Sequence, residues 1–397
     1  MLISEKIFNM KEKVLSFVKL YFSIYFILFI FPFPLFGFPI IVDNFFVWFG
    51  QNIFGLDFVK QVSTGSGDTV FDFVKLSFVL ILAAIFSIIF LFTKPSFREK
   101  VTSIAIIYGR FFLGCMLLSY GFAKFGDGQF GLPSLFRLNQ SIGDMSPMGI
   151  LWTFMGSSPA YSAFAGICQV IAGFLLLFRK TYVLGALVAF GVMTNIVVLN
   201  FCYDVPVKIF STNLALISLF IIHNNWSQIL MFLLGKPSKI TFVGFRFNKK
   251  WLQITSKVLI VLYILTITVG MSMSRIINTE ENVNDKFFAV YKNEIQSNDS
   301  LVLTKMIIDD GYAQLFYKND TIVSWDFKFD EKENTMFFKA ADSTKSNIKL
   351  HYKFIEDNKI EFSDSEKPLG KFSLTKKGDF ELLKRGFNWT SEYPYNR

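Results

Sequence analysis

The chain has few cysteines and histidines, and this scarcity excludes several kinds of site. Its 397 residues include three Cys and two His, with no CxxC pair and no Cys/His cluster at zinc-ligand spacing. Residues 281–397 contain no cysteine, so no disulfide crosslinks that segment. The sequence carries no haem, flavin or iron–sulfur motif, and so few histidines disfavour a protease-like enzyme. We therefore predict no metal site.

Charge is also scarce within seven long apolar runs. The chain has a mean hydropathy of +0.43, 52% hydrophobic residues and 51 Phe. A membrane-spanning helix needs about 20 mostly apolar residues. The predicted spans are residues 19–40, 70–92, 104–122, 159–178, 182–201, 206–222 and 258–274. The first lacks a small-residue cleavage site, which predicts an uncleaved anchor that Pro32 and Pro34 bend or end.

The basic residues are distributed unevenly along the chain. Among residues 1–280, with the N-terminus in the cytoplasm, fifteen Lys and Arg fall on the cytoplasmic side and six on the other, while Arg110 lies inside a span. Cytoplasmic loops typically carry such an excess, so this charge indicates membrane topology and not nucleic-acid binding. Seven spans then place residues 281–397 outside the cytoplasm. We expect a multi-pass protein of the bacterial inner membrane with a periplasmic C-terminal domain.

From Lys286 onward the hydrophobic period changes to two residues. Stretches such as 348–354 alternate apolar and polar side chains, and turn-forming pairs such as Asp310–Gly311 separate them. Seven or eight short antiparallel strands in about 110 residues predict a small sandwich or barrel-like domain. The predicted fold class is therefore an α-helical membrane bundle of about seven spans plus a small antiparallel β domain.

Three polar residues inside the spans form a candidate intramembrane site: Arg110, Gln169 and Asn195. An arginine in hydrocarbon costs roughly 3 kcal/mol on insertion scales, so Arg110 needs a partner, water or a route to the interface. Snorkelling to the inner interface competes with a buried role. Gln169 is flanked at i±4 by Ala165 and Gly173, a pattern that lets another helix approach closely and hydrogen-bond the amide.

A second group of polar residues predicts an outer pocket, at the far ends of the spans. Asp204 has an alternative role as the N-cap of the sixth span. The Gly-rich turn 64–69 reads as a loop with a cap, since it contains no GxxxxGK[ST] phosphate-binding motif. The outer connections 41–60 and 125–157 are amphipathic, and we expect short helices at the membrane interface there. The candidate pocket residues are Lys124, Asp144, Asn200, Asp204 and Lys208.

Residues 101–223 resemble the DoxX family. The resemblance rests on Arg110-x-x-Leu113–Gly114, on Gly121-x-x-Lys124, on a small-residue-rich fourth span ending before Arg179, and on a polar junction between spans five and six. It implies a compact core of four membrane helices, and the whole layout is similar to larger DoxX-type proteins of Bacteroidota. Family members are linked to quinone- or thiol-dependent redox work. The family pattern implies an acidic residue where this chain has Gln169, which weighs against proton transfer there.

These features divide the chain into four parts. They are a two-span N-terminal anchor (1–100), a DoxX-like core (101–223), an interfacial segment with the seventh span (224–280) and an extracytoplasmic β domain (281–397).

Three functions fit this organisation. The first is a quinone- or thiol-linked redox membrane subunit in which Arg110 and Gln169 hold a quinone and a partner supplies electrons. The second is a non-enzymatic envelope subunit whose β domain binds a partner. The third is a lipid- or small-molecule-binding protein that uses the outer pocket.

Overall fold

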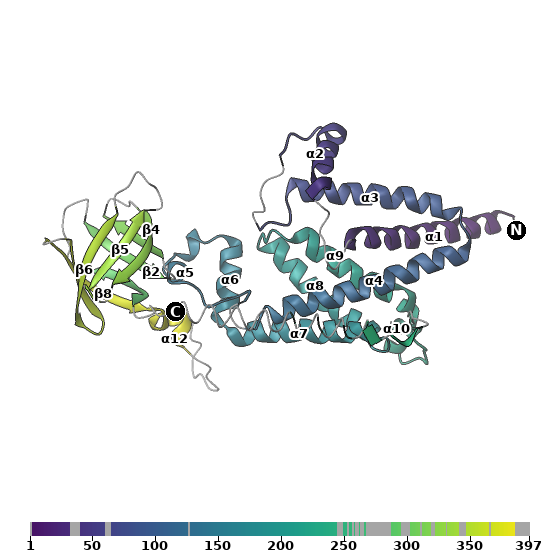
Figure 1. The fold of residues 1–397 in the computed structure, drawn as a ribbon. Helices are drawn as coiled ribbons and strands as arrows, with labels where there is room; N and C mark the ends of the chain where they lie inside the picture. The colour runs from purple at the N-terminus through teal and green to yellow at the C-terminus, as the bar shows by residue number, and fades with distance from the viewer. Residues whose placement is uncertain are drawn as a thin grey trace. The chain divides into compact units, whose positions relative to one another are not determined.

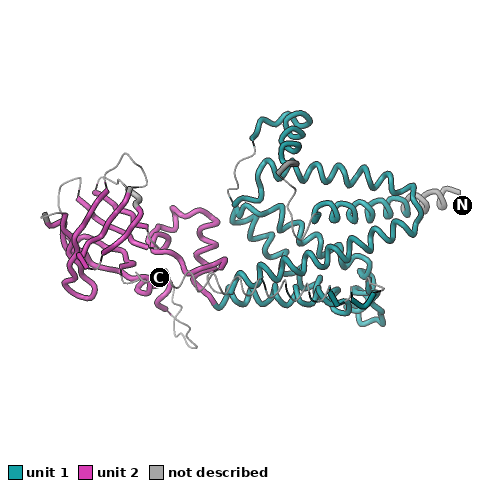
Figure 2. The backbone as a smooth tube through the Cα atoms, viewed as in Figure 1, with its two compact units in different colours: residues 1–125, 160–271 teal, residues 126–159, 272–397 magenta. Residues whose placement is uncertain are grey.

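The computed structural model divides the protein into two compact units (Figure 2). One comprises residues 1–125 and 160–271, and the other residues 126–159 and 272–397. The structure describes residues 2–31, 40–59, 65–125, 128–243, 249–251, 254–255, 258, 262, 266, 287–294, 302–309, 312–318, 322–330, 332–340, 347–364 and 367–385.

Six helices of the described residues are long and apolar enough to cross a membrane, by length and composition. They belong to the first unit, with shorter helices α2 (Ile40–Phe54) and α10 (Trp226–Leu233) beside them (Figure 1). The predicted bundle is confirmed, and the protein is an integral membrane protein. The six are α1 (Leu2–Ile30), α3 (Val70–Leu91), α4 (Pro95–Phe122), α7 (Pro159–Leu177), α8 (Tyr182–Cys202) and α9 (Lys208–Ile222).

The ends of these helices differ from the predicted spans in two places. The first helix begins at Leu2 and ends at Ile30, whereas the prediction ran over 19–40. Residues 32–39, with Pro32 and Pro34, lie outside the described residues, and the helix ends just ahead of them. α4 begins at Pro95, nine residues earlier than predicted, because Pro at the first helical position suits a helix start. The predicted seventh span, 258–274, falls mostly outside the described residues.

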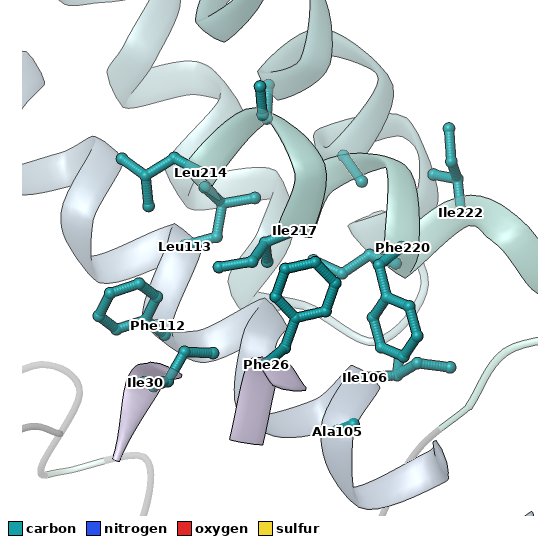
Figure 3. Packing of buried hydrophobic residues seen from close by; sticks show 14 of the residues in the cluster. Phe26, Ile30, Ala105, Ile106, Phe112, Leu113, Leu214, Ile217, Phe220 and Ile222 are labelled. Atoms are coloured by element: carbon teal, nitrogen blue, oxygen red, sulfur yellow. The ribbon is translucent and has the colours of Figure 1, made fainter. Parts of the chain in front are cut away.

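The core of the helical unit is apolar and continuous across α1, α4 and α9. Figure 3 shows Phe26 and Phe220 meeting at its centre, with ring centroids 5.1 Å apart. Two side-chain hydrogen bonds cross this core: the hydroxyl of Ser23 donates to Thr102 at 3.1 Å, and that of Tyr25 donates to Asn213. Because lipid tails are as apolar as these side chains, such polar contacts help to select which helices pair.

The C-terminal domain is a closed, eight-stranded antiparallel barrel, in which every strand pairs with the next and β8 returns to β1. This confirms the predicted antiparallel β domain. Its interior is filled by apolar side chains, including Phe338, Phe362 and Phe372. Tyr291 is also inside and donates to the Phe287 carbonyl at 2.7 Å, and burial raises the pKa of its phenol. The strands are β1 (Ala289–Asn293), β2 (Leu303–Asp309), β3 (Tyr312–Tyr317), β4 (Ile322–Asp330), β5 (Thr335–Ala340), β6 (Ile348–Glu356), β7 (Lys359–Asp364) and β8 (Lys367–Lys376).

Residues 126–159 group with the barrel in the second unit, although the sequence placed them within the helical core (Figure 2). They form α5 (Leu135–Leu138), a 3-10 turn (Ile142–Asp144) and α6 (Pro147–Ser157). Leu135 is fully buried with Val290 of β1 and Ile307 of β2. Part of this connection therefore packs on a protein surface, where the sequence predicted only membrane interface.

Candidate functional site

Arg110 lies in the middle of α4 and is buried, with only 6% of its surface exposed. Its Nε and Nη1 atoms have no hydrogen-bond partner among the described residues. A buried donor without a partner is costly, and more so when it belongs to a charged group. This side chain is therefore the clearest candidate for contact with a molecule that the polypeptide itself does not supply.

Two aromatic rings flank the guanidinium group. Its central carbon lies 4.6 Å from the ring centroid of Phe111 and 5.2 Å from that of Tyr182, the first residue of α8. Both distances lie within the range in which a ring face attracts a cation. The aromatic neighbours thus offset part of the cost of the charge, but they supply no oxygen acceptor to Nε or Nη1.

The segment 240–243 packs against the same aromatic group. The backbone N–H of Val243 donates to the Tyr182 hydroxyl at 3.0 Å, and the Phe242 ring meets Tyr182 edge-on at 6.0 Å. Asn225 is fully buried and holds the segment, because its Oδ1 accepts from both the backbone N–H and the hydroxyl of Thr241. The connection after α9 therefore folds back over the beginning of α8.

A second arginine contacts this aromatic pair. Arg179 donates from Nη2 to the Phe242 carbonyl at 3.5 Å. Across the part of the chain that the structure describes, neither Arg110 nor Arg179 forms an ion pair with a carboxylate. Arg110 and Arg179 thus lie around the pair formed by Tyr182 and Phe242. Because the buried Arg110 has unused N–H donors, this site can bind a ligand that presents an acceptor oxygen. The sequence identified Arg110, but Tyr182 and Phe242 carried no local signal.

Gln169 marks a close crossing of α4 and α7. A Cβ on Gly121 would lie 2.9 Å from the Gly166 carbonyl oxygen, and one on Gly173 would lie 3.0 Å from that of Gly114. The sequence predicted a close helix approach at Ala165 and Gly173. The structure shows it at Gly173 and at Gly166, the residue next to Ala165. Gln169 is 3% exposed and its Oε1 has no described partner. Small residues at such crossings let helix backbones come together.

This crossing also fixes the separation of Gln169 from Arg110. Gly121 lies opposite Gly166 and Gly114 opposite Gly173, so the two helices are antiparallel and Leu118 is level with Gln169. Arg110 is eight residues further along α4, about 12 Å at 1.5 Å per residue. The structure therefore does not bring these two side chains together.

Asn195 is distant from Arg110. It lies on α8 thirteen residues beyond Tyr182, about 20 Å along the axis, and its side chain is exposed. The structure therefore does not gather the three residues proposed as one intramembrane site around Arg110.

The predicted outer pocket is assembled only in part. Asn200 donates to the Ser211 hydroxyl at 3.0 Å, which joins α8 to α9. Lys208 forms an ion pair with Asp204 at 2.7 Å and lies 3.8 Å from Asp68. These contacts tie the junction of the two helices together.

Asp68 takes the capping role that the sequence suggested for Asp204. Its carboxylate accepts from the backbone N–H groups of Lys208 and Ile209 at 2.8 and 2.9 Å, while Asp204 lies in the preceding turn with a φ of 50° and an exposed side chain. Sequence reasoning missed Asp68 because the bond spans 140 residues. The predicted cap in the Gly-rich turn is confirmed: Thr69 and Asp72 form a capping box at the start of α3.

The contacts described for the other two pocket candidates are local ones. Lys124 follows the end of α4, is 6% exposed and donates to the Tyr120 carbonyl at 3.2 Å. Burial lowers the pKa of its amine to about 8. Asp144 belongs to the other compact unit, where its carbonyl accepts from Gln140. No group of three or more His, Cys, Asp or Glu suited to a metal ion occurs among the described residues.

Comparisons with known proteins give one informative relative. No family model matches the chain, and no solved structure is significantly similar. The uncharacterized protein YwoB of Bacillus subtilis (strain 168) is 36% identical over 115 residues, which cover 28% of this chain and 71% of YwoB. Because the match includes more than two thirds of YwoB at this identity, the chain belongs to the same family as YwoB.

Proposed function

We propose that this integral membrane protein is a DoxX-type redox subunit that binds a quinone head group at Arg110. One observation carries the proposal: a guanidinium group inside a membrane-spanning helix is buried with two nitrogens that have no described hydrogen-bond partner. A quinone carbonyl supplies the acceptor oxygen that those donors need. Its flat ring also suits a site bordered by Phe111 and Tyr182.

The positions of Arg110 and Gln169 indicate which side chains hold the quinone head group. Gln169 lies about 12 Å from Arg110 along the helix axes, so we assign the head group to the Arg110 donors and not to a joint Arg110–Gln169 site. Arg110 therefore binds one carbonyl, and the aromatic neighbours orient the ring. The resemblance of residues 101–223 to the DoxX family supports this assignment. The sequence has no haem, flavin or iron–sulfur motif, so electrons come from a partner.

The test is the ligand content of purified protein. The full chain is purified in mild detergent, extracted into organic solvent, and analysed by mass spectrometry. We expect a quinone at near-stoichiometric amounts, lost in Arg110→Gln because a neutral amide supplies fewer and weaker donors. Arg98→Gln is the control on the same helix: Arg98 is only half-buried and its Nη1 donates to Ser16 at 3.0 Å, although its Nε, like that of Arg110, has no described partner. Wild-type protein without quinone contradicts the redox proposal, and an anionic phospholipid in its place makes Arg110 a lipid site.

A second candidate is a non-enzymatic envelope subunit whose barrel binds a protein partner. The packed interior favours it, because an eight-stranded barrel filled by its own side chains acts through its outer surface. The same preparation separates the two candidates: an envelope protein that co-purifies in place of a quinone supports the second.

The order of the helices supports a periplasmic barrel. Successive crossings by α1, α3 and α4 carry the chain to the side opposite the N-terminus, so residues 126–159 lie on that side. α5 of this segment packs on β1 and β2. α7, α8 and α9 return the chain to the N-terminal side, and one more crossing is needed before Phe287. The predicted seventh span, 258–274, lies within that interval, and the positive-inside count makes the N-terminal side cytoplasmic.

A further inference from the structure

Within the segment 126–159, α5 packs against the barrel. Asp309, at the end of β2, accepts the backbone N–H of Leu135 at 2.6 Å and lies 3.8 Å from the Lys377 ammonium. Together with the apolar contacts of Leu135, this carboxylate fixes the first turn of α5 on the outside of the barrel.

α6 has a buried face that holds it to the rest of this segment. A Cβ on Gly149 would lie 2.6 Å from the Arg137 guanidinium, and one on Gly156 would clash with the Gly131 carbonyl oxygen. Leu151 and Met155 of the same helix are also buried. Such close backbone contacts make α6 a fixed part of the unit.

The opposite face of α6 is apolar and exposed. Ile150 and Phe154, one helical turn apart, have 37% and 54% of their surface exposed, and Ile142 in the preceding turn has 76%. Trp152 is half-buried against Phe130, with ring centroids 5.2 Å apart. Tryptophan is enriched where membrane meets water.

Two features of the chain identify what covers this face. α6 ends at Ser157 and the membrane-spanning α7 begins at Pro159, so a single residue separates them. In addition, no Asp, Glu, Lys or Arg occurs between Asp144 and Arg179. A span needs only about 20 apolar residues, and this uncharged run is longer by about the length of α6. The absence of charged residues, which a membrane environment requires, therefore includes α6 as well as the span α7.

We propose that α6 lies in the membrane interface, with Ile150 and Phe154 inserted at the boundary between headgroups and acyl chains, and that it seats the barrel unit on the bilayer. At 11 residues, or about 16 Å, α6 is too short to cross. Its partner is the lipid surface as such, because without charged side chains it has no means to select anionic headgroups. The barrel is then held at the membrane surface, because α5 of the same segment packs on it.

A photo-crosslinking experiment tests this inference on the full chain. A diazirine amino acid replaces Ile150 or Phe154, and the protein is placed in nanodiscs of phosphatidylcholine alone. Tyr312, whose side chain is 59% exposed on barrel strand β3, is the control position. We expect lipid adducts from positions 150 and 154 and none above background from position 312.

Two results would overturn the proposal. One is quenching by water at positions 150 and 154 equal to that at 312. The other is crosslinking of α6 to a protein, either a second copy or the barrel. Two separate probe positions keep the test decisive if one substitution prevents folding, and thermal unfolding of each labelled protein shows whether it has folded.

Discussion

Lys124 illustrates the effect of burial on a single charge in this protein. Its ammonium group is almost completely removed from solvent, and desolvation lowers its pKa from 10.5 to about 8. The unfolded chain therefore binds this proton more tightly than the folded protein does. Between pH 8 and 10.5 the free energy of unfolding should rise with pH, and below pH 8 the full penalty is present.

Lys124→Met should remove this penalty. We expect the variant to be more stable than wild type at pH 7 by about 1–3 kcal/mol and to lose the added stability that wild type gains between pH 8 and 10.5. Thermal unfolding in detergent across this pH range measures both effects. Lys94→Met, at an exposed position at the other end of α4, is the matched control for the loss of a lysine charge. An unaltered slope in Lys124→Met would contradict the argument.

At the scale of elements, the crossing of α4 and α7 depends on four glycines placed seven residues apart on each helix. A side chain at Gly121 would meet the Val170 side chain at 2.7 Å and the Gly166 carbonyl oxygen at 2.9 Å. Because a backbone carbonyl cannot move aside as a flexible side chain can, the helices themselves would have to separate.

Gly121→Ala should therefore destabilise the helical unit by about 1–3 kcal/mol, the usual cost of overpacking. Gly191→Ala on α8 is the matched control, since a Cβ there meets nothing within 4 Å. Its stability should be equal to wild type or higher by up to about 1 kcal/mol, because alanine favours helix more than glycine does. Unfolding in a detergent titration compares the two. Equal losses in both variants would mean that the crossing is not tight.

At the scale of the whole molecule, the docking of α5 on the barrel has a topological consequence. The segment that carries α5 and the barrel must lie on one side of the membrane, since Leu135 is buried against β1 and β2. Six crossings alone would return the chain to the N-terminal side. We therefore predict a further crossing between residue 236 and the barrel.

Reporter fusions test that crossing. Alkaline phosphatase fused after Lys236 should be inactive, because this site is expected in the cytoplasm, whereas fusion after Arg397 should give an active, exported enzyme. Green fluorescent protein at the same two sites should show the opposite pattern and control for expression. If both fusion points report the same side, the seven-span topology is wrong.

The sequence by itself determined the membrane helices, the strand-rich domain and the anomaly at Arg110. Each of these depends on short-range information: a run of apolar residues, a period of two, or one charge inside a span. The glycine crossing was also partly visible, because small residues at helical spacing predict close approach whichever helix supplies the partner.

Only the tertiary structure decided which residues meet. It placed Tyr182 beside Arg110, separated Gln169 and Asn195 from it, gave the cap of α9 to Asp68, and joined Leu135 to Asp309 across 174 residues. The physical reason is that the sequence pattern of an apolar helix in lipid does not specify which other helices it packs against. Their pairing is set by the fit of side chains and a few polar contacts, which exist only once the chain has folded.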